Sequence, residues 1–129
     1  MAKRIIRPMG MVNSPGYSHA IVKDGAPVFI AGQVALDGKG QLVGADDAKA
    51  QAVQVLLNLR AVVTACGGSL DDVVKLTVYT TDLAYRPAIV EARGQFFTAG
   101  RMPASTFVVV SSLAEKRFLV EIEAVAVIE

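Results

Sequence analysis

The chain has 129 residues, of which 53% are apolar and 19% charged, and its formal net charge is +1. This length favours one domain over residues 1–129 with a core of its own. The nearly balanced charge provides no general attraction to nucleic acid or to an anionic membrane, so we expect neither as a partner. One cysteine and one histidine exclude a disulfide framework and a zinc-type cluster, and we expect no metal and no cofactor.

No apolar run approaches the roughly 18 residues that a membrane-spanning helix needs. Residues 1–7 are basic at the start but lack the apolar segment of a signal peptide, so a cytoplasmic protein is expected. The apolar fraction is nevertheless above the usual 45–50%. A subunit interface is the simplest place for this excess apolar surface.

Residues 1–7 are expected to form a short edge strand. A dense turn signal follows at residues 13–16. Two strands are then predicted at residues 17–23 and 27–31, and Asp24-Gly25 between them predicts a hairpin turn.

A long helix is predicted next. Asp46 or Asp47 is a suitable N-cap, and Gly67 is a suitable glycine just beyond the C-terminus. Apolar residues recur at helical spacing and predict the core face: Ala52, Leu56, Leu59, Val63 and Cys66. Gln51, Gln54 and Asn58 are expected on the opposite side of the helix.

Residues 73–80 are rich in β-branched side chains and predict a strand. Pro87 suits the start of a second helix that runs to about Phe97, with Ile89, Ala92 and Phe96 on its core face. A strand at residues 105–111 follows.

The last stretch, residues 118–129, alternates with a period of two. One face is apolar throughout and predicts contact with a core: Phe118, Val120, Ile122, Ala124, Ala126 and Ile128. The other face mixes carboxylates with aliphatic side chains: Leu119, Glu121, Glu123, Val125, Val127 and Glu129. We interpret the mixed face as covered by a partner subunit or an enclosed pocket; the alternative is a solvated strand face.

The order strand, strand, helix, strand, helix, strand, strand predicts an α+β fold, in which two helices cover one face of a mixed sheet. The mixed face of the last strand would then lie on the uncovered side of the sheet. That side is the expected surface for other subunits.

Six segments in collinear order resemble the Rid family, also called YjgF/YER057c/UK114, the reactive-intermediate deaminases. They are Pro15-Gly-Tyr-Ser-His-Ala20, Ala31-Gly-Gln33, Asn58-Leu59, Asp72-Val-Val-Lys-Leu-Thr-Val-Tyr79, Met102-Pro-Ala104 and Val120-Glu-Ile-Glu-Ala-Val-Ala126. The resemblance implies a fold like that of chorismate mutase and a homotrimer whose sheets enclose a central barrel. It also implies pockets in the clefts between subunits, and hydrolysis of imines and enamines to ketones and ammonia.

The family pattern implies roles for particular residues. Tyr17, Gly32 and Glu121 match a pocket tyrosine, a backbone contact and the glutamate that orients water, so Glu121 and Tyr17 are the candidate catalytic residues. Ser105 follows Pro103-Ala104, where the family has an arginine that binds the substrate carboxylate. Val90 stands where an asparagine is frequent, and His19 replaces a glutamine. Ser105, Thr106 and His19 join Gly32 as candidate substrate-binding residues.

Serine at position 105, where the family has an arginine, is a large chemical change. A guanidinium binds a carboxylate through two charged hydrogen bonds worth roughly 1.5–3 kcal/mol each, whereas a hydroxyl supplies one neutral donor. The affinity for an α-imino acid would fall by at least about two to three decades, and we expect little activity on simple α-imino acids. The alternative is that Arg86, Arg93 or Arg101 enters the pocket from another direction.

Structural roles remain open for the same residues. Glu121 can be a carboxylate satisfied by backbone donors, Tyr17 an aromatic that seals a subunit seam, and His19 a strand-face residue. Cys66 is expected to be simply buried. For function, the leading hypothesis is a small-molecule hydrolase of imines or enamines that are not held by the usual arginine. The alternative is a metabolite-binding module without catalysis. Ribonuclease activity is not expected, because the sequence has no basic stripe, no His pair and no set of metal ligands. Chorismate mutase-like isomerisation is not expected either, because that pocket depends on cations that hold a dianion.

Overall fold

The computed structural model describes residues 2–13 and 16–129. Ser14 and Pro15, in the middle of the expected turn and at the start of the first resembling segment, lie outside the described residues, as does Met1. The elements in chain order are β1 (Ala2–Ile5), β2 (Ala20–Lys23), β3 (Ala26–Gln33), α1 (Ala48–Ala65), η1 (Leu70–Asp72), β4 (Val73–Thr80), η2 (Leu83–Tyr85), α2 (Arg86–Gly94), β5 (Ala104–Val109) and β6 (Val120–Ile128).

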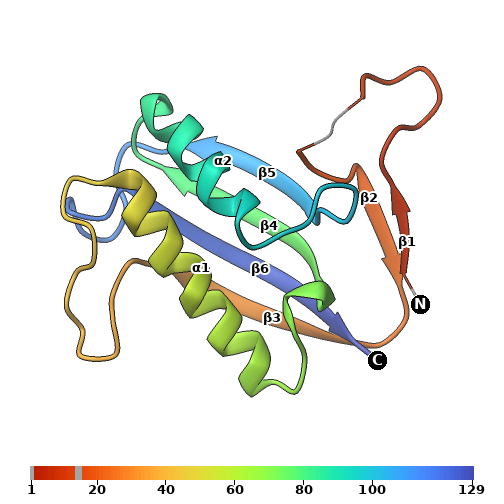
Figure 1. Cartoon of the computed structure of the whole chain (residues 1–129), viewed down its shortest axis with the longest axis horizontal. Helices are drawn as coiled ribbons and strands as arrows, with labels where there is room; N and C mark the ends of the chain where they lie inside the picture. The colour runs from red at the N-terminus through yellow and green to blue at the C-terminus, as the bar shows by residue number, and fades with distance from the viewer. Residues whose placement is uncertain (1, 14–15) are drawn as a thin grey trace.

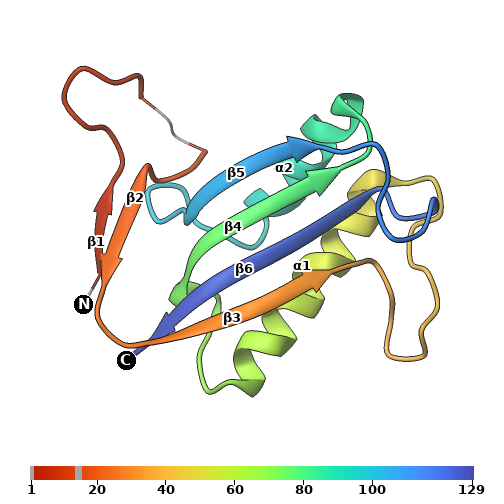
Figure 2. The same ribbon diagram turned by 180° about the vertical axis from the view of Figure 1, so that it is seen from behind.

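A four-stranded mixed sheet in the order β3-β6-β4-β5 forms the centre of the fold. Strands β4 and β5 are parallel, and the other two pairs are antiparallel. Both helices lie on one face of this sheet (Figure 1), and the view from behind shows the opposite face bare (Figure 2). The predicted α+β architecture is therefore confirmed. None of the described helices is long and apolar enough to cross a bilayer.

Strand β6 has the two faces that its alternation predicts. Val120, Ile122 and Ala126 are fully buried beneath the helices. On the bare side, Glu121 and Val125 are half-buried. Phe29 of β3, which pairs with Val125, is 80% exposed. Burial of one strand face provides the core, while the other face keeps apolar area in contact with solvent.

The ends of helix α1 follow the expected capping chemistry. The Asp47 side chain accepts a hydrogen bond of 3.0 Å from the Ala50 amide, and Gly67 adopts a φ of +89° just beyond the helix. Helix α2 begins at Arg86 and ends at Gly94, three residues before the predicted end. Glycine is a poor helix former, which is consistent with termination there.

Two predictions about α1 are wrong. Gln51 is fully buried, because its amide donates to the Gly44 and Arg117 carbonyls and accepts from the Leu119 amide. Because three backbone groups satisfy the hydrogen bonds of the Gln51 amide, this side chain can be buried. Cys66 is exposed, because it is the C-cap and follows the last helical turn that packs on the sheet.

The hairpin predicted at Asp24-Gly25 is also wrong. Strand β2 pairs with β1 in a separate two-stranded sheet, whereas β3 pairs with β6. Gly25 has a φ of +144°, and a Cβ there would lie 2.5 Å from the Ile128 carbonyl oxygen. The chain therefore bends tightly past the end of β6 and passes from one sheet to the other.

Replacing Gln51 with leucine should destabilise the protein by about 2–4 kcal/mol, because the buried Leu119 amide would lose its acceptor and the Gly44 and Arg117 carbonyls would each lose a donor. The matched control is Gln54→Leu on the same helix. The Gln54 side chain donates to the Asn58 side chain, and its replacement should cost less than about 1 kcal/mol. Urea unfolding measures both. Equal midpoints for Gln51→Leu and the parent would contradict the structural role of this amide.

Candidate functional site

The segment that carries Tyr17 is fixed against the start of β5. The buried Ser18 hydroxyl donates to the Met102 carbonyl at 2.5 Å, and the Ser18 amide donates to the Pro103 carbonyl at 3.1 Å. These bonds place Tyr17 beside β5. The Tyr17 ring meets the His19 ring edge to face, with centroids 5.2 Å apart, so His19 supports Tyr17 from the side.

Tyr17 lies at a small cavity of about 180 Å³ between helix α2 and strand β5. Its lining residues are Tyr17, Arg86, Val90, Arg93, Ser105 and Phe107, and we call it the arginine cavity. Ser105 pairs with Leu76 and Phe107 pairs with Val78, both of which are core residues. Ser105 and Phe107 therefore belong to the helix side of the sheet, where Arg93 also lies.

Arg93 is the central group of this cavity. It is only 8% exposed. One terminal nitrogen donates to the Ser105 hydroxyl at 3.3 Å, and the other donates to the Gly16 carbonyl at 2.9 Å. Burial lowers the pKa of Arg93, and the positive charge of Arg86 lowers it further. Arginine remains protonated despite this lower pKa, so Arg93 carries a fixed positive charge.

The charge of Arg93 has no ionic partner in the part of the chain that the structure describes. Among the described residues no carboxylate forms an ion pair with Arg93, and its Nε is buried without a hydrogen-bond partner. A buried charge normally has a partner because desolvation is costly. The unused donors of Arg93 are thus suited to a planar anion such as a carboxylate.

Glu121 occupies a different place, on the bare face of the sheet. A Cβ added to Gly32 would lie 2.0 Å from a carboxylate oxygen of Glu121, so any larger residue there would force the carboxylate to move. On the same face the Tyr79 hydroxyl donates to Glu123, and this hydrogen bond raises the pKa of Tyr79. We call Gly32 and Glu121, with the neighbouring bare strand surface, the glutamate face.

The predicted site residues therefore fall into two groups. Tyr17, His19 and Ser105 lie with Arg93, whereas Gly32 and Glu121 lie together on the glutamate face. Thr106 is on the bare side too, since it pairs with Thr77 and its hydroxyl accepts from Lys75 at 2.6 Å. One chain cannot bring both groups to one small ligand, because the sheet separates them.

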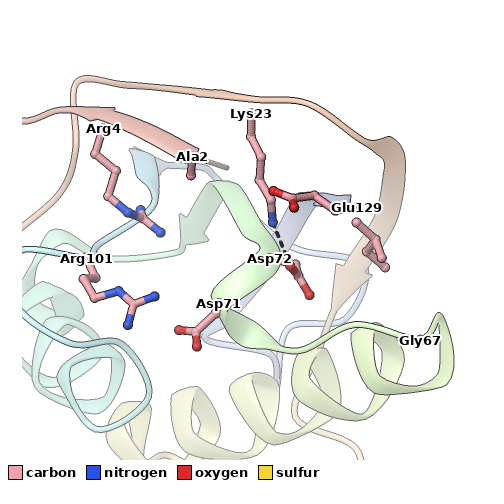
Figure 3. A pocket seen from close by; sticks show the side chains of 9 residues that line it. Ala2, Arg4, Lys23, Gly67, Asp71, Asp72, Arg101 and Glu129 are labelled. Carbon is pink, nitrogen blue, oxygen red and sulfur yellow. Dashed lines mark hydrogen bonds and ion pairs between the residues drawn. The ribbon is translucent and has the colours of Figure 1, made fainter.

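Of the three arginines considered as substitutes, only Arg93 reaches Ser105. The Arg86 guanidinium lies 5.5 Å from the centroid of the Phe107 ring, at the rim of the arginine cavity. Arg101 points into a separate charged cavity of about 690 Å³ together with Arg4 and Asp71 (Figure 3). The larger cavity thus contains none of the predicted site residues.

The sequence did not predict all of the residues that line the arginine cavity. Phe107 was not predicted to line a site, and Val90 was noted only as a replacement. The signal for Arg93 was available in part, because Arg86, Val90 and Arg93 recur at helical spacing on one stripe of α2. Nothing in the spacing shows that this stripe faces Ser105. Within the described residues, no group of three or more His, Cys, Asp or Glu side chains is placed to hold a metal ion.

Comparison with known proteins identifies the family. The family model described as Endoribonuclease L-PSP matches residues 11–128, nearly the whole chain. A crystal structure of the Rid protein YyfB from Yersinia pestis superposes with a TM-score of 0.88 at 38% identity, covering 97% of this chain and 98% of that one. The chain belongs to the Rid family.

Relatives of this Rid protein carry different names. A RutC family protein of Pyrococcus horikoshii, PH0854, is 43% identical over 110 residues, which is 85% of each chain. A 2-iminobutanoate/2-iminopropanoate deaminase of Dermatophagoides farinae is 34% identical over 128 residues, which is 98% of each chain.

If Arg93 is retained in this Rid protein for ligand binding and not for folding, Arg93→Met should leave the free energy of unfolding within about 1 kcal/mol of the parent, or raise it. The reason is that methionine removes an unpaired buried charge. Arg117→Met, which breaks the exposed pair with Glu115, is the control and should change stability by less than about 1 kcal/mol. A loss above about 2 kcal/mol for Arg93→Met would indicate a structural arginine.

Proposed function

We propose that the protein hydrolyses imines or enamines of amino acids to 2-oxo acids and ammonia, at sites formed between two chains of a homotrimer. One chain would supply the arginine cavity and its neighbour the glutamate face. The observation that carries this proposal is the buried Arg93 guanidinium, which has no carboxylate partner among the described residues and donates to the hydroxyl of Ser105. The membership of the chain in the Rid family supports the same reaction class.

Arg93 would bind the substrate carboxylate in place of the arginine that Ser105 replaces. Two charged hydrogen bonds from a guanidinium contribute roughly 1.5–3 kcal/mol each, and the Ser105 hydroxyl would add a neutral donor. This proposal stands against the prediction of little activity on simple α-imino acids, which rests on Ser105 alone. Tyr17 would close the cavity over the bound ligand.

The chemistry needs a water molecule and a group that moves protons. Water adds through its oxygen to the imine carbon while the electrons of the C=N π bond move to nitrogen, which takes up a proton. The tetrahedral intermediate then loses ammonia as its hydroxyl becomes the carbonyl of the 2-oxo acid. Glu121 of the neighbouring chain would take the proton from the attacking water and return one to the leaving nitrogen. No oxidant or reductant is consumed.

Gly32 would support the role of Glu121 by leaving space for its carboxylate. With no side chain, its backbone approaches the Glu121 carboxylate closely, which limits the positions that the carboxylate can occupy. Exposed apolar area on the same side of the sheet, with Phe29 80% exposed and Val108 36% exposed, supports contact with another chain there.

The second candidate is a module that binds a 2-oxo or imino acid without turnover. It would use the same guanidinium, so the two candidates differ only in the production of ammonia. Ammonia and 2-oxo acid appearing faster than the spontaneous rate, from imines generated in situ by an amino-acid oxidase, would favour the hydrolase. The family model carries the name endoribonuclease, and such an activity would require the protein to bind and cleave RNA. The net charge of +1 does not favour binding to RNA.

Glu121→Gln should lower imine turnover about 10²–10⁴-fold, because glutamine keeps the size of the side chain but cannot accept a proton. The mass in light scattering should remain that of three chains. Glu123→Gln is the matched control, since Glu123 lies on the same strand face and is occupied by the Tyr79 hydroxyl. Full turnover by Glu121→Gln, or a larger loss in Glu123→Gln, would refute the assignment of Glu121.

A further inference from the structure

The cavity of about 690 Å³ that contains Arg101 lies away from both groups of predicted site residues (Figure 3). We call it the charged cavity, because six of its lining residues are charged: Arg4, Lys23, Asp71, Asp72, Arg101 and Glu129. Ile128, which also lines it, is seven residues beyond Glu121 in β6, which corresponds to roughly 23 Å along the strand. The charged cavity and the arginine cavity share no described lining residue.

Two of the six charges neutralise each other and fix the wall of the cavity. The Lys23 ammonium group lies 2.7 Å from an Asp72 carboxylate oxygen, and these side chains are only 8% and 24% exposed. The Asp72 carboxylate also accepts from the Ser69 amide at 2.8 Å, and the Ser69 hydroxyl accepts from the Asp71 amide at 3.2 Å. The short helix η1 is held by these bonds, so the backbone of Asp71 has a fixed position.

Arg4 and Arg101 both point into the cavity, one from β1 and the other from the segment before β5 (Figure 3). One terminal nitrogen of Arg4 donates to the Met102 carbonyl at 2.8 Å. Neither guanidinium forms an ion pair with a carboxylate of the described residues. Burial lowers the pKa of Arg4, the positive charge of Arg101 lowers it further, and Asp71 raises it. Two like charges are therefore close enough to repel each other, and a carboxylate bound between them would remove that repulsion.

Asp71 gives the same cavity a negative side. Among the described residues its carboxylate forms no ion pair. The three cationic and three acidic residues of the lining balance, so the cavity has no net charge. A dianion such as phosphate would be repelled by Asp71, and a simple amine would be repelled by the two guanidinium groups. A molecule that carries one charge of each sign matches both sides of the cavity.

We propose that the charged cavity binds free α-amino acids, with the carboxylate at Arg4 and Arg101 and the ammonium group at Asp71. This is a second ligand site. It is independent of the proposed function, because it uses no residue of the arginine cavity or of the glutamate face. Inorganic phosphate, which needs the same two arginines but not Asp71, is an alternative occupant that the test distinguishes.

The test is calorimetry with three probes: L-alanine, propionate, which lacks the ammonium group, and inorganic phosphate. L-Alanine should bind about 10-fold more tightly than propionate or phosphate, which corresponds to one charged hydrogen bond. Asp71→Asn should remove this preference and leave propionate binding unchanged or tighter. Arg101→Gln alters an exposed side chain and should weaken L-alanine and propionate alike, each about 10-fold. Glu115→Gln and Arg117→Gln, which change an exposed ion pair outside the cavity, are the matched controls and should retain the parental affinities.

Arg93→Met distinguishes the charged cavity from the arginine cavity, and it should bind L-alanine as tightly as the parent. Loss of L-alanine binding in Arg93→Met but not in Arg101→Gln would place the amino acid in the arginine cavity and overturn the inference. Phosphate binding more tightly than L-alanine, or no measurable binding of L-alanine to the parent, would overturn it as well. A protein that binds L-alanine as described but releases no ammonia from imines would support this site and contradict the hydrolase.

Discussion

The alternation of strand β6 is the constraint on which the rest of the structure depends. It lies between β3 and β4, so its side chains on one face must fill the space beneath both helices. Val120, Ile122 and Ala126 fill that space and are fully buried. The same period of two forces Glu121 onto the opposite face. A shift of one residue in this register would bury the carboxylates and expose the core.

That constraint also separates the two halves of the candidate site. Ser105 pairs with Leu76 of the core and lies on the helix side, whereas Glu121 lies on the bare side. An intervening sheet prevents one ligand from touching both within one chain. In the proposed trimer, a second chain packed on the bare face would resolve the separation and would also cover apolar side chains such as Phe29. Assembly and the proposed function would then have the same physical origin.

Arg93 shows how ligand binding and stability can conflict. The guanidinium is desolvated, receives no compensating carboxylate from the described residues and lies near a second cation, Arg86. Such an arrangement is unfavourable in the free protein and becomes favourable when an anion is bound.

Much of the fold could be predicted from sequence, because the signals were local. The period of β6 and the caps of α1 depend on residues close together in the chain. The errors concern contacts between distant segments. Gln51 is buried because it meets backbone groups of residues 117 and 119, and the β2–β3 connection fails to form a hairpin because β3 pairs with β6.

The residues of the candidate site also divide into those that the sequence indicated and those that only the structure identifies. The family resemblance indicated Glu121 and Gly32, and the structure places these two in contact. The resemblance also marked Ser105 as lacking a cation, but spacing could not select Arg93 from three arginines. The choice depends on which stripe of α2 faces β5, and tertiary packing determines that stripe.

Mixed trimers test most directly whether the active site is shared between chains. Arg93→Met and Glu121→Gln chains, carrying different affinity tags, would be co-expressed and purified through both tags. Each variant alone should be nearly inactive. In a ring of three, every mixed trimer contains one site with an intact Arg93 from one chain and an intact Glu121 from its neighbour, so about a third of the parental turnover should return. Mixed trimers no more active than the separate variants would contradict a shared site.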